Sequence, residues 1–346
     1  MEQLVTLDFE TYYSSTYGLT KQTTEEYIRH PEFQVIGVAI KMNDEEKTTF
    51  HTGTHQEIQA SLDNIDWRVS GLVCHNTLFD GAILAWVFKI TPAFYFDTLS
   101  IARALHGTNA GGSLKALAER YHLGKKGTEV LDAKGKRLEE FKPSELSAYA
   151  SYCINDVQIT FDLFGIIAPK FPESEHQLID ITLRMFIQPQ LKVDDALLIE
   201  RLQEVRDEKA LMLEGLMARL ECDTNEAVRK KLASNKQFAE LLEELGVPCP
   251  MKESPTTGKQ APALAKTDEG FIALQQHEDP LIQELCAVRL GTKSTIEESR
   301  IERFIDIGSR NKGFLPIPLR YYGAHTGRWA GSEKVNFQNL PSRDAK

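Results

Sequence analysis

The chain begins with an apolar stretch, LVTLDFE at residues 4–10, that ends in two acids. Alternation of this kind predicts a strand, and Asp8 and Glu10, two positions apart, leave the same face of it. Two neighbouring carboxylates repel each other unless a proton or cation lies between them. Oxygen ligands of this type suit Mg²⁺ or Mn²⁺. Since an isolated pair of acids is also compatible with a solvated strand end, further acids are needed to decide.

Two later segments supply further acids. NTLFD at residues 76–80 follows a buried-looking strand, which places Asp80 at a strand-to-helix junction. YCIND at residues 152–156 lies in a predicted helix, where a spacing of four puts Tyr152 and Asp156 on one face. Taken singly, Asp80 is also compatible with a helix cap and Tyr152 with a core residue. The ordered set DxE, NxxFD and YxxxD is a specific pattern.

The first 165 or so residues alternate strand-like and helix-like patterns. Three early strands in succession, followed by strands separated by helices, predict a mixed sheet with hairpins first and crossovers later. The predicted strands are 4–8, 35–42, 47–51, 71–75 and 94–96, and the predicted helices are 55–62, 79–87, 113–121 and 143–164.

After Pro172 the strand signal nearly vanishes. Leucines and other apolar residues at spacings of three and four predict a long amphipathic helix that starts near Asp194 and Asp195. Residues 246–268 contain four prolines and two glycines, which is typical of an exposed loop. A second long helix is predicted over residues 280–307. The boundary between a mixed α/β domain and a helical one is expected near residues 170–173.

The composition is that of a soluble globular protein. The 346 residues are 42% hydrophobic and 26% charged, and they carry a formal net charge of −10. No apolar run is long enough to span a membrane, and the N-terminus lacks the basic and apolar regions of a signal peptide. Five cysteines without paired spacing fit reduced thiols in a cytoplasm. Taken alone, the acidic balance argues mildly against a nucleic-acid partner.

The three acidic motifs resemble those of the DEDDy 3′→5′ exonucleases, which share a ribonuclease H-like fold. The resemblance implies that Asp8, Glu10, Asp80 and Asp156 are the four acids that bind two divalent metal ions, Mg²⁺ with Mn²⁺ able to substitute. It also implies that Tyr152 orients the attacking water. At an ordinary pKa near ~10 the tyrosine hydroxyl is a poor base, so positioning is its expected role.

Longer stretches are similar to the exonuclease regions of phage-type family A DNA polymerases. They include EEYIRHPEF, FDTLSIAR and SLKALAERYHLGKKG. From this resemblance we expect three residues near the motifs to touch the terminal nucleotide, although core packing would also explain the phenylalanine. They are Thr11, Asn76 and Phe79.

The rest of the chain resembles the thumb and the start of the palm of the same polymerases. The implied domains are a 3′→5′ exonuclease domain at 1–170, a helical thumb-like region at 171–310 and the start of a truncated palm at 311–346. The implied contacts to primer–template duplex are made by Arg328, Gln338 and Asn339. Since the palm carboxylates and the fingers motifs do not occur in the 346 residues, we expect an N-terminal polymerase fragment without polymerase activity.

The local distribution of charge favours a DNA partner more than the net charge of the whole chain does. Residues 120–142 hold seven basic residues against four acids, and residues 310–346 hold seven against two. Such islands can follow a phosphate backbone, although a solvated loop remains an alternative for the first.

The leading hypothesis is a metal-dependent 3′→5′ DNA exonuclease that proofreads and releases 5′-mononucleotides from single-stranded or frayed 3′ ends. The alternatives are an RNA 3′ exonuclease of the ribonuclease D type and a non-catalytic DNA-binding fragment. The sequence leaves the oligomeric state open.

Overall fold

A five-stranded mixed sheet forms the centre of the first compact unit. In the computed structural model, which describes residues 3–43, 45–125, 127, 133–254 and 258–340, the strand order is β3-β2-β1-β4-β5. β1 pairs antiparallel with β2 and parallel with β4, so the predicted change from hairpins to crossovers is confirmed. A register shift between Glu10 and Thr11 ends the regular ladder just after the acidic pair. The strands are β1 (Gln3–Thr11), β2 (Val35–Met42), β3 (Thr49–Thr52), β4 (Ser70–Cys74) and β5 (Phe94–Asp97).

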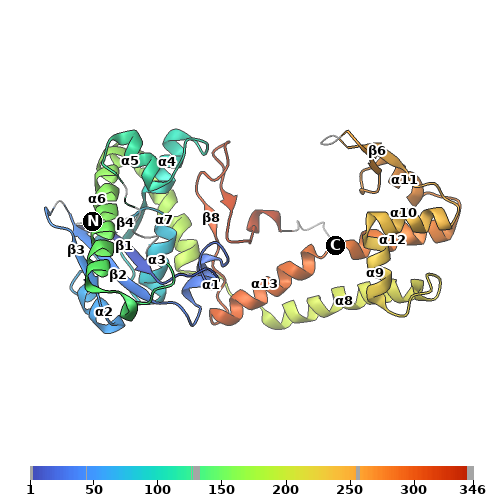
Figure 1. Cartoon of the computed structure of the whole chain (residues 1–346), viewed down its shortest axis with the longest axis horizontal. Coiled ribbons are helices and arrows are strands. Elements are labelled where there is room, and N and C mark those ends of the chain that lie inside the picture. The colour runs from blue at the N-terminus through green and yellow to red at the C-terminus, as the bar shows by residue number, and fades with distance from the viewer. Residues whose placement is uncertain (1–2, 44, 126, 128–132, 255–257, 341–346) are drawn as a thin grey trace. The chain divides into compact units, whose positions relative to one another are not determined.

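Helices cover the two faces of this sheet (Figure 1). The long helix α6 (Pro143–Ile167) packs across β1 and β2, while α3 (Thr77–Trp86) and α7 (Glu173–Ile187) pack together beside β5. The core between them is apolar and fully buried, with Val5, Leu72 and Leu163 each at 0% exposure. The remaining helices of this part are α1 (Thr24–Ile28), α2 (His55–Asp63), α4 (Thr98–His106), α5 (Leu114–Tyr121) and the 3₁₀ turns Leu138–Glu140 and Ala168–Lys170.

The first unit consists of Met1–Lys192 together with Arg310–Lys346, so it extends past the boundary expected near residue 170. α7 belongs to it because the Asp180 carboxylate accepts a hydrogen bond of 2.8 Å from the backbone of Tyr95 on β5. The C-terminal segment is anchored on α7, where Trp329 Nε1 donates to Thr182 Oγ1 over 3.0 Å. This segment contains β8 (Leu319–Arg320), β9 (Ala330–Gly331) and the 3₁₀ turn Phe337–Asn339.

The second unit, Val193–Ser309, is mostly helical and has its own apolar core. The predicted single helix over 280–307 is wrong. It is broken at Ser294, which has an extended backbone with φ −83° and ψ 126°. The following helix starts directly after the break. The elements are α8 (Asp195–Met217), α9 (Asn225–Ala233), α10 (Asn235–Glu244), β6 (Met251–Glu253), β7 (Gln260–Pro262), α11 (Glu269–Gln275), α12 (Pro280–Lys293) and α13 (Ile296–Arg310).

The predicted architecture, a mixed sheet with flanking helices followed by a mostly helical region, is therefore confirmed. Within the part of the chain that the structure describes, none of the helices combines the length and apolarity of a membrane span. Residues 128–132 of the first basic island and 341–346 of the second lie outside the described residues.

Candidate active site

The predicted acids come from three elements that meet at the end of β1. Ligand atoms of Asp8, Glu10 and Cys153 all lie within 4.8 Å of one another. Asp80, in the first turn of α3, is tied to the same strand, because its Oδ1 accepts a hydrogen bond of 3.0 Å from the backbone N–H of Phe9. The fold thus brings Asp8, Glu10 and Asp80 into one cluster, in which Glu10 and Asp80 are buried and Asp8 is half-buried.

Asp80 is a strongly perturbed acid of this cluster. Its side chain is buried, with 2% exposure. Burial raises the pKa of Asp80 well above its ordinary value, and the nearby carboxylates of Asp8 and Glu10 raise it further. Such an arrangement requires either a proton on Asp80 or a cation among the acids.

Tyr152 and Asp156 lie on α6 on the face that is turned to the sheet, and both are buried. The Tyr152 hydroxyl lies beside the Asp156 side chain. Burial raises the pKa of the Tyr152 hydroxyl far above its ordinary value, and Asp156, Glu10 and Asp8 add to this effect. The hydroxyl therefore stays protonated at neutral pH and is available as a hydrogen-bond donor.

Two further residues of α6 reach the cluster and were missed by sequence reasoning. The Tyr149 hydroxyl donates to Glu10 Oε2 over 2.5 Å, and its ring stacks on Tyr152 at a centroid distance of 6.4 Å. Cys153 Sγ lies 3.4 Å from the backbone oxygen of Asp8. The signal was present in the spacing, because positions 149, 152, 153 and 156 share one helix face.

The donor set of the cluster fits a hard divalent cation. Burial raises the pKa of the Cys153 thiol well above its ordinary value, and the negative charges of Asp8 and Glu10 raise it further. A neutral thiol is a weak ligand, so the carboxylate oxygens are the ligands that remain. Clustered carboxylate oxygens are the donors that Mg²⁺ and Mn²⁺ prefer.

A wall of aromatic side chains continues from the end of β1. Thr11 Oγ1 lies 2.8 Å from the hydroxyl of Tyr27, and this hydroxyl also donates to the backbone oxygen of Tyr12 over 2.5 Å. The ring of Phe79, one residue before Asp80, lies 6.0 Å from that of Tyr27 between centroids. The structure thus brings Thr11 and Phe79 to the same tyrosine, next to the acids.

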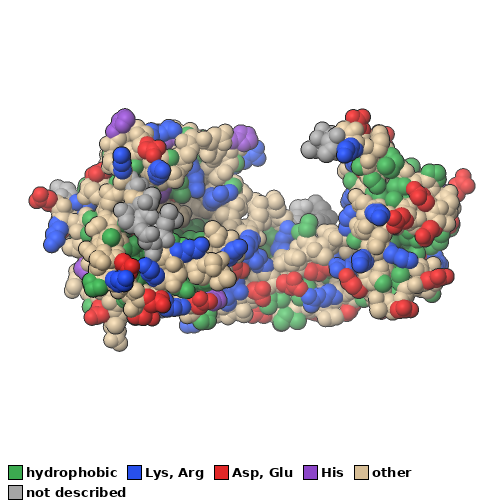
Figure 2. All heavy atoms as spheres, viewed as in Figure 1, with side chains coloured by type: hydrophobic (Ala, Val, Ile, Leu, Met, Phe, Trp, Pro, Cys, Tyr) green, Lys and Arg blue, Asp and Glu red, His purple; other side chains and the backbone are tan. Residues whose placement is uncertain are grey.

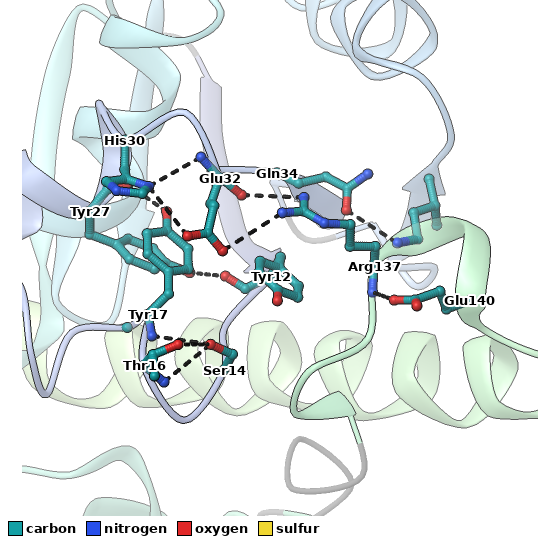
Figure 3. A network of polar contacts seen from close by, with 12 residues as sticks. Tyr12, Ser14, Thr16, Tyr17, Tyr27, His30, Glu32, Gln34, Arg137 and Glu140 are labelled. Carbon is teal, nitrogen blue, oxygen red and sulfur yellow. Dashed lines mark hydrogen bonds and ion pairs between the residues drawn. The ribbon is translucent and has the colours of Figure 1, made fainter.

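A polar network holds this wall in place (Figure 3). Tyr17 stacks on Tyr27 with ring centroids 4.7 Å apart. From the other side, the Arg137 guanidinium lies 4.2 Å from the centroid of the Tyr12 ring, and it is paired with Glu32 over 3.9 Å. Arg137, in the segment before α6, therefore connects the first basic island to the loop after β1.

Asn76, also predicted to touch DNA, is the exposed residue that starts α3. Its backbone is left-handed, with φ 74°, and its N–H donates to Asp97 Oδ1 over 2.8 Å. The same carboxylate accepts from Thr77 N and, through Oδ2, caps α4 at Ser100 N. Asp97 therefore positions the starts of both α3 and α4.

Three predicted DNA contacts lie in the C-terminal segment of the first unit. Arg328, Gln338 and Asn339 are all exposed. Among the described residues, no contact joins them to the acids, so the structure places them outside the cluster.

Known structures share this fold at low sequence identity. A search of curated proteins finds no match. Among solved structures, the fold is similar to that of the POL domain of Pol1 from M. smegmatis, solved in complex with DNA primer-template and dNTP. The TM-score is 0.60 at 15% identity, and the match covers 99% of this chain and 53% of that one. The chain thus spans about half the length of this structure.

A second solved structure, Brucella melitensis NrnC, matches with a TM-score of 0.40 at 15% identity, covering 52% of this chain and 81% of that one. The family comparison is more specific, since a family model of polymerase A type, described as a 3′-5′ exonuclease, matches residues 2–172. That range contains β1, α3 and α6, which carry all the clustered acids. The residues that are similar to this 3′-5′ exonuclease family therefore include every acid of the cluster.

Proposed function

We propose that this chain is a metal-dependent 3′→5′ DNA exonuclease, the proofreading part of a family A DNA polymerase, and that it releases 5′-mononucleotides. The observation that carries the proposal is the buried acidic cluster at the end of β1, with Tyr152 beside it, within the residues that are similar to a 3′-5′ exonuclease family. Carboxylates in this density are costly to bury without a cation, which makes metal-assisted hydrolysis the chemistry that best explains them.

The four acids would hold two divalent ions, Mg²⁺ or Mn²⁺. Asp8 lies centrally, since it neighbours Glu10, Asp80 and Cys153, and is the acid best placed to be shared. When bound, a pair of such ions neutralises the phosphate, lowers the pKa of a bound water and stabilises the departing 3′ oxygen.

The neighbouring side chains would position the substrate. Tyr152 keeps its proton and would orient the attacking water through its hydroxyl. Thr11 and Phe79, both held by Tyr27, would contact the terminal nucleotide together with Asn76. The duplex contacts of Arg328, Gln338 and Asn339 belong to a complete polymerase, and we propose no nucleotidyl transfer by this chain.

Matched substrates test this proposal. Purified protein with Mg²⁺ and a 5′-labelled single strand should give a ladder of shortened products, and EDTA should abolish it. A DNA strand and an RNA strand of the same sequence should be compared in parallel. Cleavage of DNA in preference to RNA supports the polymerase-type assignment. Preference for RNA would favour the ribonuclease D alternative, and binding of DNA without turnover in Mg²⁺ or Mn²⁺ would favour the non-catalytic one.

A further inference from the structure

A cavity of about 680 Å³ opens in the first unit beside Asn76, the residue that starts α3. Its wall is formed by the end of β4, by α4, by the glycine-containing loop that joins α4 to α5, and by the segment at Arg320 and Gly323, where the chain leaves β8. All of these parts belong to the same compact unit. The cavity is large enough for a nucleotide-sized group.

The charged side chains that line this cavity are all basic. Arg103, Lys115 and Arg320 line it, and none of its described lining residues is acidic. Figure 2 shows Lys and Arg side chains gathered around a hollow on this unit. In the described part of the chain, neither Arg103 nor Arg320 forms an ion pair or a side-chain hydrogen bond. Two guanidinium groups therefore face one cavity without a carboxylate partner.

Two acids, Asp97 and Glu333, line an adjoining cavity together with these arginines, but their hydrogen bonds within the described part of the chain go to other groups. Burial lowers the pKa of Arg103; Asp97 opposes that shift, and Arg320 adds to it. The Asp97 carboxylate is occupied by the starts of α3 and α4. Glu333, in the adjoining cavity, accepts hydrogen bonds from the backbone and hydroxyl of Thr24. An external anion is thus the missing partner for the arginine pair.

The cavity lies at the start of α3, the helix that carries Asp80 of the proposed active site. Its lining includes Asn76, which lies one helical turn before Asp80. An adjoining cavity of about 190 Å³ shares Asn76, Arg103 and Arg320 with it and extends to Leu78. The two arginines therefore line cavities that reach the start of α3, the helix whose first turn carries Asp80.

The wall of the cavity is fixed rather than loose. His75 is hydrogen-bonded on both ring nitrogens, to Thr98 Oγ1 and to the backbone oxygen of Gly112, each over 2.9 Å. Gly112 packs so closely on α4 that a Cβ at this position would lie 2.8 Å from Leu99 Cδ1. His75 therefore links the end of β4 to the loop between α4 and α5 that contains Gly112.

We propose that this cavity binds a phosphodiester of the substrate strand, upstream of the linkage that is cleaved, through Arg103 and Arg320. This inference rests on the proposed exonuclease function and adds a binding site for the strand that leads to the acids. Paired guanidinium groups recognise phosphate oxygens well, and Lys115 adds positive charge near them. The site would attract a polyanion locally although the whole chain carries a net charge of −10.

The test measures binding of a 5′-fluorescein single-stranded DNA 12-mer to the full chain in EDTA, over a series of salt concentrations. Arg320→Gln changes an exposed side chain, and Arg103→Gln tests the half-buried one after its melting temperature has been matched to wild type. We expect each to weaken binding about tenfold and to lower the slope of log K against log salt by roughly 0.7 for each phosphate that the variant no longer neutralises. Arg68→Gln removes the same charge from an 87% exposed side chain before β4 and should bind like wild type.

A second experiment identifies which phosphate of the DNA strand the cavity binds. Oligomers with a single neutral methylphosphonate at successive positions should show one position that weakens wild-type binding but has no further effect on Arg103→Gln or Arg320→Gln. The proposal is overturned if both variants keep the wild-type affinity and salt slope, or if free dTMP displaces the strand from this cavity. If wild type neither binds nor cleaves DNA, the exonuclease function itself fails. If it cleaves DNA while the arginine variants are unchanged, only the phosphate site fails.

Discussion

Replacing Tyr149 by Phe removes one hydroxyl and leaves the ring in place. In the structure that hydroxyl donates to Glu10 Oε2, while the ring stacks on Phe141 and Tyr152 with centroids 5.5 and 6.4 Å away. The substitution therefore isolates a single hydrogen bond to a buried carboxylate that we propose to bind metal. If the bond orients Glu10, its loss should act on metal binding rather than on folding.

The size of the effect follows from the type of bond. A hydrogen bond to a charged group contributes about 1.5–3 kcal/mol, and 1.36 kcal/mol corresponds to a factor of ten. Because a bound cation can itself orient Glu10, the lower part of this range applies. We expect the half-saturating Mg²⁺ concentration to rise about tenfold in Tyr149→Phe, with most of the wild-type rate restored at saturating Mg²⁺.

The assay is single-turnover cleavage of a 5′-labelled single strand over a Mg²⁺ titration. Tyr121→Phe is the matched control, because its hydroxyl bonds His106 on α4 and does not touch the acids. The control should titrate like wild type. An unchanged Mg²⁺ titration in Tyr149→Phe would refute the reasoning and reduce Tyr149 to a packing residue.

Three further outcomes are expected. Tyr152→Phe should slow single-turnover cleavage by roughly 10²-fold, within the range of positioned proton-transfer groups, without shifting the Mg²⁺ titration; complete loss would indicate a chemical role. Asp80→Asn should raise the melting temperature of the EDTA-treated protein, by about 2–4 °C for each ~1 kcal/mol of repulsion relieved, because it removes a buried carboxylate that Asp8 and Glu10 repel. Because the folded pKa of Asp80 lies above its ordinary 3.8, ionisation of Asp80 at rising pH lowers the free energy of unfolding of wild type but not of Asp80→Asn. The difference in melting temperature between the two should therefore widen above about pH 4 and close at lower pH. Mg²⁺ should raise the melting temperature of wild type but not of Asp8→Ala, and an equal rise in both would argue against a metal at Asp8.

Much of the fold could be predicted because its signals are local. The apolar run rich in Val and Ile at residues 35–42 and the 3.6-residue periodicity in 143–167 predict a strand and a helix whatever surrounds them. The break at Ser294 was missed because apolar periodicity continues across it, although Gly291, Ser294 and Thr295 lower helix propensity there. The first unit reaches Lys192 because α7 packs on β5, a contact that local sequence does not encode.

The acids of the candidate site were predictable because ordered motifs fix their elements. Their partners were not, since the Tyr149–Glu10 bond joins residues 139 positions apart. The same reason hides the cavity, which pairs Arg103 on α4 with Arg320 from the C-terminal segment. Side chains that meet only through tertiary packing leave no pattern along the chain.

The most direct test of the central claim is cleavage of a 5′-labelled DNA single strand by Asp8→Ala. Asp63→Ala, an exposed acid at the end of α2, is the control and should cleave like wild type. We expect a Mg²⁺-dependent ladder with wild type and with the control, and its loss with Asp8→Ala, which should melt no lower than wild type in EDTA. Undiminished cleavage by Asp8→Ala would contradict the claim that the acidic cluster at the end of β1 is the active site.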